Sequence, residues 1–278
     1  MMTQIEHVIQ HLKELRLDQM VKILDQVIQE AEREGHDPLE VLARLADAQV
    51  GINRDRASER RVKEARFPDR KTLDNLDFDF QPTLDRARVM ALSRLDFIRR
   101  HENVLLGGNS GTGKSHIGKA LALLACGAGF RVRFTTCEDL FRDLYAAQCD
   151  YTLPVRLKYY TLPDLLMIDD LGFERIEIKQ AGNANLLLKV VNARYEKKST
   201  IITSNIALDK WGDYLGDAAL AMATLDRFIH HAALFHIDGP SWRDRECRQM
   251  LINQPPAAEK AAPRAQRAKR TKEAAPSA

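Results

Sequence analysis

With 278 residues, of which 45% are hydrophobic and 29% charged, the chain has the size and composition of a globular protein with one large domain or two smaller ones. No apolar run is long enough to span a bilayer, and residues 1–10 lack the regions of a secretory signal, so we expect a cytoplasmic protein without a membrane partner. The net charge is only +3, so the distribution of basic residues is more informative than their total.

The amino-terminal part of the chain has helical periodicity. Apolar residues recur at helical spacing from residue 3 to about residue 34. The segment Gly35-His36-Asp37-Pro38 breaks this pattern, with Asp37 as an N-cap and Pro38 as the first residue of a helix that continues through Val50. We therefore predict a small all-α domain over residues 1–66 that contacts DNA or a partner.

A cluster of basic residues occupies the end of this helical region. Three acids interleave with it, namely Asp55, Glu59 and Glu64. One interpretation is a solvated helix with many ion pairs, and the other is a face that contacts DNA phosphates. The excess of bases over acids slightly favours DNA. The candidate DNA-binding residues are Arg54, Arg56, Arg60, Arg61 and Lys63, with Arg66 completing the cluster.

Helical and strand-like segments alternate after Phe67-Pro68. This alternation predicts an α/β domain over residues 67–253 with a parallel sheet flanked by helices. The expected strands are residues 103–107, 131–135, 165–168 and 200–203, and the expected helices are residues 117–128, 138–149, 184–196 and 217–231.

A phosphate-binding loop follows the first expected strand. Residues Gly108-Asn109-Ser110-Gly111-Thr112-Gly113-Lys114-Ser115 fit G-x-x-x-x-G-K-[ST] at every fixed position, between a strand and a helix. Glycines let backbone N–H groups face phosphate oxygens, and the helix dipole adds positive charge. We predict that this loop and His116 bind ATP, with Lys114 on the β- and γ-phosphates and Ser115 as a ligand of Mg²⁺.

Two acids, Asp169 and Asp170, stand where the apolar segment Leu165-Leu166-Met167-Ile168 ends. In phosphate-loop ATPases the first such acid holds Mg²⁺ and the second polarises the attacking water. We therefore predict that Asp169 serves the metal and Asp170 is catalytic. Two acids in a turn after a strand are a plain structural alternative, which the phosphate loop upstream disfavours.

Three further polar residues are candidates for contact with the γ-phosphate. Asn205 follows the strand at residues 200–203 and could orient the lytic water, although Ser-Asn is also good turn chemistry. Arg227 lies on an expected helix and Arg243 follows the turn Gly239-Pro240. An arginine can stabilise transition-state charge, but a surface ion pair explains either residue taken alone.

The carboxyl-terminal tail and the cysteines carry weaker signals. Residues 254–278 are rich in Pro, Ala and basic residues and have too little apolar content to fold, so we expect a disordered basic tail. The tail could strengthen DNA binding or keep the protein soluble. The four cysteines form no C-x-x-C pair, so no metal centre or disulfide framework is expected.

These motifs, in this order, resemble the IstB/DnaC branch of AAA+ ATPases. The resemblance rests on the phosphate loop, the strand that ends in two acids, and three later segments, namely Ser204-Asn205, Leu225-Asp226-Arg227 with His230-His231, and Gly239-Pro240-Ser241-Trp242-Arg243. It covers roughly residues 5–250 and includes the amino-terminal helical region.

The resemblance implies an ATP-dependent helper of an insertion-sequence transposase. Such helpers form homo-oligomers on duplex DNA with ATP at subunit interfaces, bend the DNA, and recruit or activate the cognate transposase. It further implies that Asn205 is the sensor-1 residue, that Arg227 is an arginine finger acting on a neighbour's ATP, and that Arg243 is sensor-2-like. Asp170 departs from the Glu of many members, which puts the hydrolysis rate in doubt, and Trp242 replaces a Tyr.

Three other functions remain open from the sequence. A replicative-helicase loader has the same ATPase core and differs in its partner. A switch that holds ATP on DNA with little turnover is compatible with the shorter Asp170. A small-molecule phosphotransferase also uses such a loop, although the paired acids and Arg227 argue against it.

Overall fold

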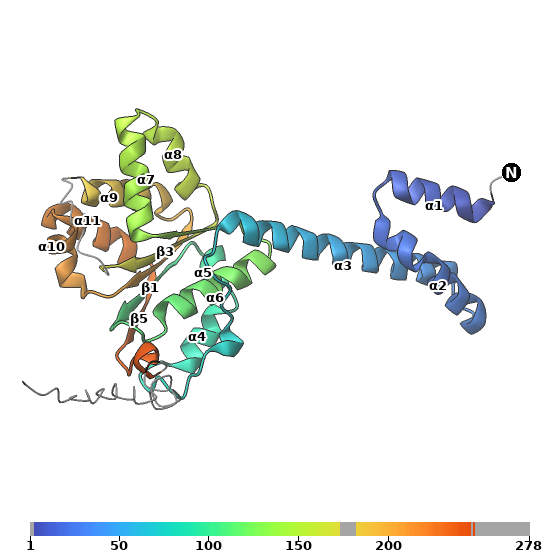
Figure 1. Cartoon of the computed structure of the whole chain (residues 1–278), viewed down its shortest axis with the longest axis horizontal. Helices are drawn as coiled ribbons and strands as arrows, with labels where there is room; N and C mark the ends of the chain where they lie inside the picture. The colour runs from blue at the N-terminus through green and yellow to red at the C-terminus, as the bar shows by residue number, and fades with distance from the viewer. Residues whose placement is uncertain (1–2, 173–181, 246, 248–278) are drawn as a thin grey trace, which may run out of the picture. The chain divides into compact units, whose positions relative to one another are not determined.

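The computed structural model describes residues 3–172, 182–245 and 247, and the chain divides into two compact units, Met1–Trp242 and Arg243–Ala278. All the helices and strands below belong to the first unit (Figure 1). The predicted tail at residues 254–278 lies outside the described residues. In the described part of the chain, no helix is both long and apolar enough to cross a membrane.

Three helices form the amino-terminal region, namely α1 (Gln4–Glu14), α2 (Asp18–Glu34) and α3 (Pro38–Ala65). The helical periodicity from residue 3 to about residue 34 corresponds to two helices, because the chain turns between α1 and α2 with Arg16 in the left-handed region at φ 59°. Apolar residues recur at helical spacing on both sides of this turn, so the pattern does not reveal it. Gln49 of α3 stabilises the start of α2, since its Oε1 accepts the N–H of Gln19 at 2.9 Å.

Helix α3 begins as predicted, with the Asp37 side chain accepting the N–H of Leu39 and Pro38 in the first turn. It runs through the basic cluster without interruption and ends at Arg66, which is left-handed at φ 63°. The last turns pack on the α/β core, because Val62 and Ala65 are buried with residues of helix α6 (Lys114–Gly127). One continuous helix therefore joins the amino-terminal region to the core.

The core is a five-stranded parallel sheet in the order β2-β3-β4-β1-β5. This confirms the predicted α/β class. The strands are β1 (Asn103–Gly108), β2 (Val132–Thr136), β3 (Leu165–Leu171), β4 (Ser199–Ser204) and β5 (Ala232–Ile237). The sequence did not predict β5, which lies at an edge of the sheet and is only partly buried; its two alanines have low strand propensity, and it follows α11 after only two residues.

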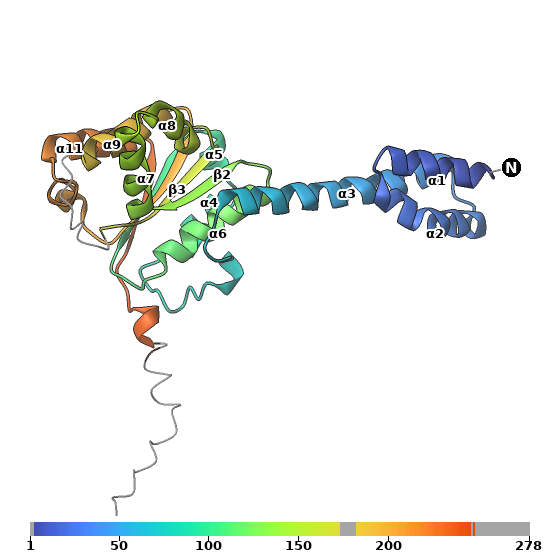
Figure 2. The same ribbon diagram turned by 45° about the horizontal axis from the view of Figure 1, so that its top comes forward.

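Helices cover both faces of the sheet (Figures 1 and 2). Along β1, Val104 and Leu106 pack on the α6 side, while Leu105 packs on the side of α7 and α9, as alternation in a strand requires. The other helices on the α6 side are η1 (Leu73–Asn75), α4 (Arg86–Leu92) and α5 (Asp96–Arg99). Those on the opposite side are α7 (Cys137–Cys149), α8 (Leu153–Thr161), α9 (Asn183–Arg194), η2 (Leu208–Lys210), α10 (Trp211–Leu215) and α11 (Ala218–Ile229).

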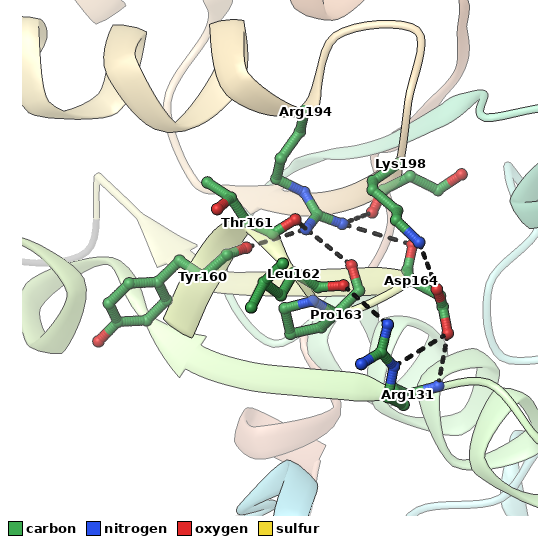
Figure 3. Close-up of polar contacts among 9 residues, drawn as sticks. Arg131, Tyr160, Thr161, Leu162, Pro163, Asp164, Arg194 and Lys198 are labelled. Atoms are coloured by element: carbon green, nitrogen blue, oxygen red, sulfur yellow. Dashed lines mark hydrogen bonds and ion pairs between the residues drawn. The ribbon is translucent and has the colours of Figure 1, made fainter. Parts of the chain in front are cut away.

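A buried arginine organises the edge of the sheet where β3 and β4 begin (Figure 3). Arg194 is 1% exposed, and its guanidinium donates to the carbonyls of Tyr160 and Pro163 at 2.9 Å each and to the Thr200 hydroxyl at 2.9 Å. Burial lowers the pKa of Arg194 to about 9, so the side chain remains charged at neutral pH. The cation therefore satisfies carbonyls of the α8–β3 turn that would otherwise be buried without partners.

Candidate nucleotide site

The candidate site residues gather at the edge of the sheet where its parallel strands end. The phosphate loop joins the end of β1 to α6, and β4 lies between β1 and β3. Asn205 directly follows β4, and Asp169 and Asp170 are among the last three residues of β3. In an open parallel sheet, ligands bind outside the carboxyl ends of the strands where the strand order reverses. The fold thus brings loop, acids and amide to one edge.

Three glycines give the phosphate loop its shape. Gly108, Gly111 and Gly113 have φ of 134°, 78° and 96°, in the region that side chains disfavour. A Cβ at Gly108 would lie 2.1 Å from the carbonyl oxygen of Ile237, and one at Gly111 would lie 2.2 Å from Ser241 Oγ. The loop therefore packs closely against the end of β5 and the residues after it, which only glycine permits.

The Lys114 side chain folds back over the loop. It is 4% exposed, and its Nζ donates to the carbonyl oxygen of Asn109 at 2.5 Å. The Thr112 hydroxyl donates to the same carbonyl at 2.9 Å, and the Asn109 amide donates to Asp238 Oδ1 at 2.7 Å. These bonds hold an ammonium group at the loop, where it can meet phosphate oxygens.

The residues after Lys114 face different neighbours. Ser115 is half-buried in the first turn of α6. His116 Nε2 lies 2.7 Å from the carbonyl oxygen of Thr72, which fixes Nε2 as the protonated nitrogen of the ring. Exposed Ser110 belongs to the loop itself. His116 therefore ties α6 to the segment before α4, in addition to any contact with nucleotide.

Asp169 is held by two side chains that sequence reasoning missed. The carboxylate is 2% exposed and accepts the Thr203 hydroxyl at 2.6 Å. Lys119 Nζ lies 3.9 Å from its other oxygen. Lys119 comes one helical turn after Ser115, and Thr203 is two residues before Asn205, so spacing from the motifs was the only available signal.

Asp170 has an unusual backbone conformation. Its φ is 61°, in the left-handed region, and the pairing of β3 with β4 is irregular between Ile168 and Leu171. Its N–H donates to the Thr203 hydroxyl at 2.9 Å. Asp and Asn are the non-glycine residues that best tolerate this region. The bulge turns two successive acids toward different surroundings, with Asp169 buried and Asp170 half-buried.

Arg227 lies away from the loop of its own chain. It is exposed in the last turn of α11 and donates to Asn192 Oδ1 at 2.6 Å. Helix α11 leads into the start of β5, where the N–H of Asn103 meets the His231 carbonyl at 2.7 Å. This is the amino end of β1, about 17 Å of strand from the loop at its carboxyl end. Arg243 is exposed and is the first residue of the second unit.

The basic residues of α3 divide into two groups. Arg54, Arg56, Arg60 and Lys63 are exposed. Arg61 is half-buried and its Nε donates to the Cys126 carbonyl at 2.8 Å, so it joins α3 to the end of α6. The exposed group stays a prediction for DNA contact, while Arg61 has a structural contact as well.

The donor set at the sheet edge fits Mg²⁺-ATP. Ser115 and Asp169 offer a hydroxyl and a carboxylate, which are oxygen ligands of the kind that Mg²⁺ prefers. Asp169 is buried beside one hydroxyl and one ammonium, so it is shielded from bulk water. The three positive-φ glycines add no side chain of their own to the loop that would bind phosphate. The residues present therefore suit a divalent cation next to phosphates.

Comparison with known sequences agrees with these motifs. Residues 10–250 match the family of the IstB-like ATP binding protein. The chain is 36% identical over 209 residues to the "Insertion sequence IS5376 putative ATP-binding protein" of Geobacillus stearothermophilus, covering 75% of this chain and 82% of that one. It is 34% identical over 238 residues to the "Insertion sequence IS21 putative ATP-binding protein" of Pseudomonas aeruginosa, covering 86% and 89%.

Comparison with solved structures agrees with the fold. AMPPCP-bound DnaA from Aquifex aeolicus superposes with a TM-score of 0.50 at 21% identity, covering 70% of this chain and 58% of that one. This likeness shows that the core shares the fold of that protein. The family resemblance inferred from the motifs is confirmed, because the match extends over nearly all the described residues. The chain is a member of the IstB-like ATP binding protein family.

Proposed function

We propose that the protein is a Mg²⁺-dependent ATPase that assembles on duplex DNA as a homo-oligomer and there recruits or activates an insertion-sequence transposase. The observation that carries the ATPase part is the Asp169–Thr203–Asp170 arrangement at the edge that bears the phosphate loop. The relatives named for insertion sequences support the transposition part. Residues 1–66 serve in this proposal as the region for contact with DNA or a partner.

Each residue at the sheet edge has a distinct task in the proposed hydrolysis. The loop N–H groups and Lys114 bind and neutralise the phosphates. Ser115 and Asp169 hold Mg²⁺, which when bound draws charge from the phosphate oxygens. Asn205 orients the attacking water, and Asp170 accepts a proton from that water. The water oxygen attacks the γ-phosphorus, and the bond between the γ-phosphorus and the β-phosphate oxygen breaks. The products are ADP and phosphate.

The proposed active site is completed by a second subunit. Arg227 lies at the amino end of the sheet and β1 separates it from the loop of its own chain. An exposed arginine in that position can reach a γ-phosphate only on a neighbouring molecule, where it would stabilise transition-state charge. Arg243 would act as a sensor of the nucleotide. Hydrolysis is thereby linked to assembly, and this linkage suits a regulatory ATPase.

The test combines ATP turnover with electron microscopy of the assembled protein. Hydrolysis is measured over a range of protein concentrations, with and without duplex DNA, and the same samples are imaged. We expect oligomers on DNA with ATP, and turnover per subunit that rises with protein concentration. Lys114→Ala, which removes the phosphate-binding ammonium, is the inactive control. Turnover per subunit that changes neither with duplex DNA nor with protein concentration would contradict the proposal.

A binding experiment separates the transposase helper from the helicase loader. Immobilised protein with ATP is offered the transposase of the same insertion sequence and the replicative helicase of the same cell. Capture of the transposase alone supports the proposal. Capture of the helicase alone would assign the same ATPase core to helicase loading instead.

A further inference from the structure

A basic pocket lies at the opposite end of the sheet from the nucleotide site. It is an open hollow of about 710 Å³ between the end of α3, the start of β2 and helix α8. Its walls include Val132 at the start of β2 and Pro163 just before β3. Since the strands are parallel and the phosphate loop follows the end of β1, ATP and a ligand in this pocket would not compete for space.

The pocket has a large excess of positive charge. Glu64 is the one acid among its lining residues, and its carboxylate lies 3.8 Å from Arg60 Nε. Six lining side chains are cationic, namely Arg61, Lys63, Arg66, Arg131, Arg133 and Lys158. Among the described residues, Arg131 is the one cation of the six that has a carboxylate oxygen within 4.0 Å, that of Asp164.

Tyr159 gathers the arginines on one wall of the pocket. The guanidinium carbon of Arg133 lies 3.5 Å from the centre of the Tyr159 ring, and that of Arg66 lies 5.7 Å away. A third arginine, Arg156, is 4.7 Å from the ring and is paired with Asp143. The Tyr159 hydroxyl is buried and has no hydrogen-bond partner among the described residues. Two cations without carboxylate partners, Arg66 and Arg133, thus lie against one ring in the wall of the pocket.

This arrangement costs free energy when the pocket holds no anion. Arg133 is 8% exposed, and its Nη1 donates to the Glu64 carbonyl at 3.1 Å. Burial, followed by the nearby charge of Arg66, lowers the pKa of Arg133 to about 10. A buried cation without an ionic partner is unfavourable unless an anion neutralises it. An oxyanion would accept hydrogen bonds from the guanidinium groups.

Exposed basic residues continue from the pocket along α3. Arg56, Arg60 and Lys63 follow at i, i+4 and i+7, so they share one face of the helix. The row extends about 10 Å at 1.5 Å per residue. A compact anion such as free phosphate would occupy the pocket alone, whereas a polymer with a regular series of charges matches the pocket and the row together.

We propose that this pocket, with the row on α3, binds the phosphate backbone of duplex DNA. The proposal rests on the proposed function only for the identity of the polymer. It assigns DNA to the amino end of the sheet, away from the nucleotide, and gives Arg66, Arg133 and Lys158 the central contacts. Contacts of this kind are independent of base sequence.

The test is the salt dependence of binding of the full chain to a DNA duplex of mixed sequence. Fluorescence anisotropy measures the binding. The pocket variant is Arg66→Asn with Lys158→Gln, because both side chains are exposed and Asn tolerates the left-handed backbone at Arg66. The matched control is Arg142→Gln with Lys189→Gln, since both side chains are exposed, on α7 and α9, and lie outside residues 1–66 and outside the pocket. Both variants remove two positive charges.

We expect the slope of log K against log salt to become shallower by about 2 in the pocket variant and to stay unchanged in the control. Lys158→Gln alone should change the slope by about 1. Thermal melts of each variant establish that the fold is kept. Equal slopes for the pocket variant and the control would overturn the pocket assignment while leaving DNA binding by the protein intact.

Two further outcomes distinguish the proposals. If the unaltered protein binds no duplex in any nucleotide state, the proposed function is overturned and this inference with it. Inorganic pyrophosphate, titrated calorimetrically at constant ionic strength, tests for a free anion instead. Pyrophosphate that binds the unaltered protein and the control but not the pocket variant would indicate a site for a free phosphate. If the salt slopes of DNA binding also agree among these three proteins, the DNA assignment is wrong.

Discussion

The Thr203 hydroxyl donates a 2.6 Å hydrogen bond to the carboxylate of Asp169 and also accepts the N–H of Asp170 at 2.9 Å. One side chain of β4 thus contacts both acids at the end of β3. Because β4 also lies beside β1, which carries the phosphate loop, this contact relates the acids to the loop through the central strand of the sheet. Thr203 is therefore a positioning residue for the proposed metal ligand.

Replacing Thr203 by Val keeps the shape of the side chain and removes the hydroxyl. We expect the Mg²⁺ concentration needed for half-maximal ATP turnover to rise by about 10–100-fold, as for other partners of metal ligands. Thr203→Ser retains the hydroxyl and should restore the Mg²⁺ dependence. A Thr203→Val protein with unaltered Mg²⁺ dependence but lower thermal stability would show a purely structural role.

Asp170→Asn should separate nucleotide binding from hydrolysis. Asn keeps the size of the side chain and tolerates φ 61°, but it does not accept a proton from water. We expect turnover to fall by about 10²–10⁴-fold while a fluorescent ATP analogue binds with unchanged affinity. Asp170→Glu lengthens the side chain but places a residue that is less tolerant of the left-handed region at φ 61°, so its turnover compares the two effects. Full turnover in Asp170→Asn would remove Asp170 from the reaction.

Arg227→Ala should weaken turnover and ATP-dependent assembly with little effect on ATP binding. The expected loss is about 10³-fold or more, typical of an arginine finger. Mixing the two variants gives the decisive measurement. An Arg227→Ala subunit keeps the phosphate-binding Lys114, and a Lys114→Ala subunit keeps the proposed finger Arg227. Turnover should reappear in the mixture. Arg142→Ala, an exposed arginine of α7, is the control. No recovery on mixing, together with unchanged turnover in Arg227→Ala alone, would contradict a shared site.

Arg194→Lys should destabilise the core although it keeps the charge. The guanidinium serves carbonyls at several points of the α8–β3 turn and the start of β4, and a single ammonium does not reach them all (Figure 3). Buried carbonyls left without partners cost about 1–3 kcal/mol each, so we expect a loss on the order of 3 kcal/mol in the free energy of unfolding. Urea titration measures it, with exposed Arg142→Lys as the control. Equal urea midpoints for the two variants would refute this role.

Asp164 should contribute to loss of stability in acid. Burial acts to raise the pKa of Asp164, but hydrogen bonds from the Lys198 ammonium and the Arg131 backbone outweigh it, and the pKa is lowered (Figure 3). A carboxyl whose pKa is lower in the folded state stabilises the protein above its unfolded pKa of about 3.9, and the contribution is lost as the pH falls through the folded pKa.

The comparison for Asp164 is the free energy of unfolding as the pH is lowered. Asp164→Asn should be less stable than the unaltered protein at pH 7, and the two should converge from about pH 5 downward. Asp213→Asn, at an exposed acid on α10, is the control. A constant difference between the two proteins down to low pH would contradict the assignment.

The sequence was informative where function depends on adjacent residues. Gly108–Ser115 is a local motif, and its backbone conformation follows from its glycines. The N-cap at Asp37 was readable for the same reason. The turn at Arg16 was not, because apolar residues recur at helical spacing on both sides of it, and β5 was not, because its two alanines have low strand propensity and it follows α11 after only two residues. Thr203 and Lys119 carry no motif, and only strand order and helix packing bring them to Asp169.

The sequence by itself determined the phosphate loop, the pair of acids, the parallel α/β class and the family, because each depends on short-range patterns or on a fixed order of motifs. Only the tertiary structure decided how Thr203 joins the two acids, on which end of the sheet Arg227 lies, and that Arg66, Arg133 and Lys158 face one pocket with Tyr159. Those relationships join residues far apart in the chain, and they arise from strand order and helix packing, which local spacing does not encode.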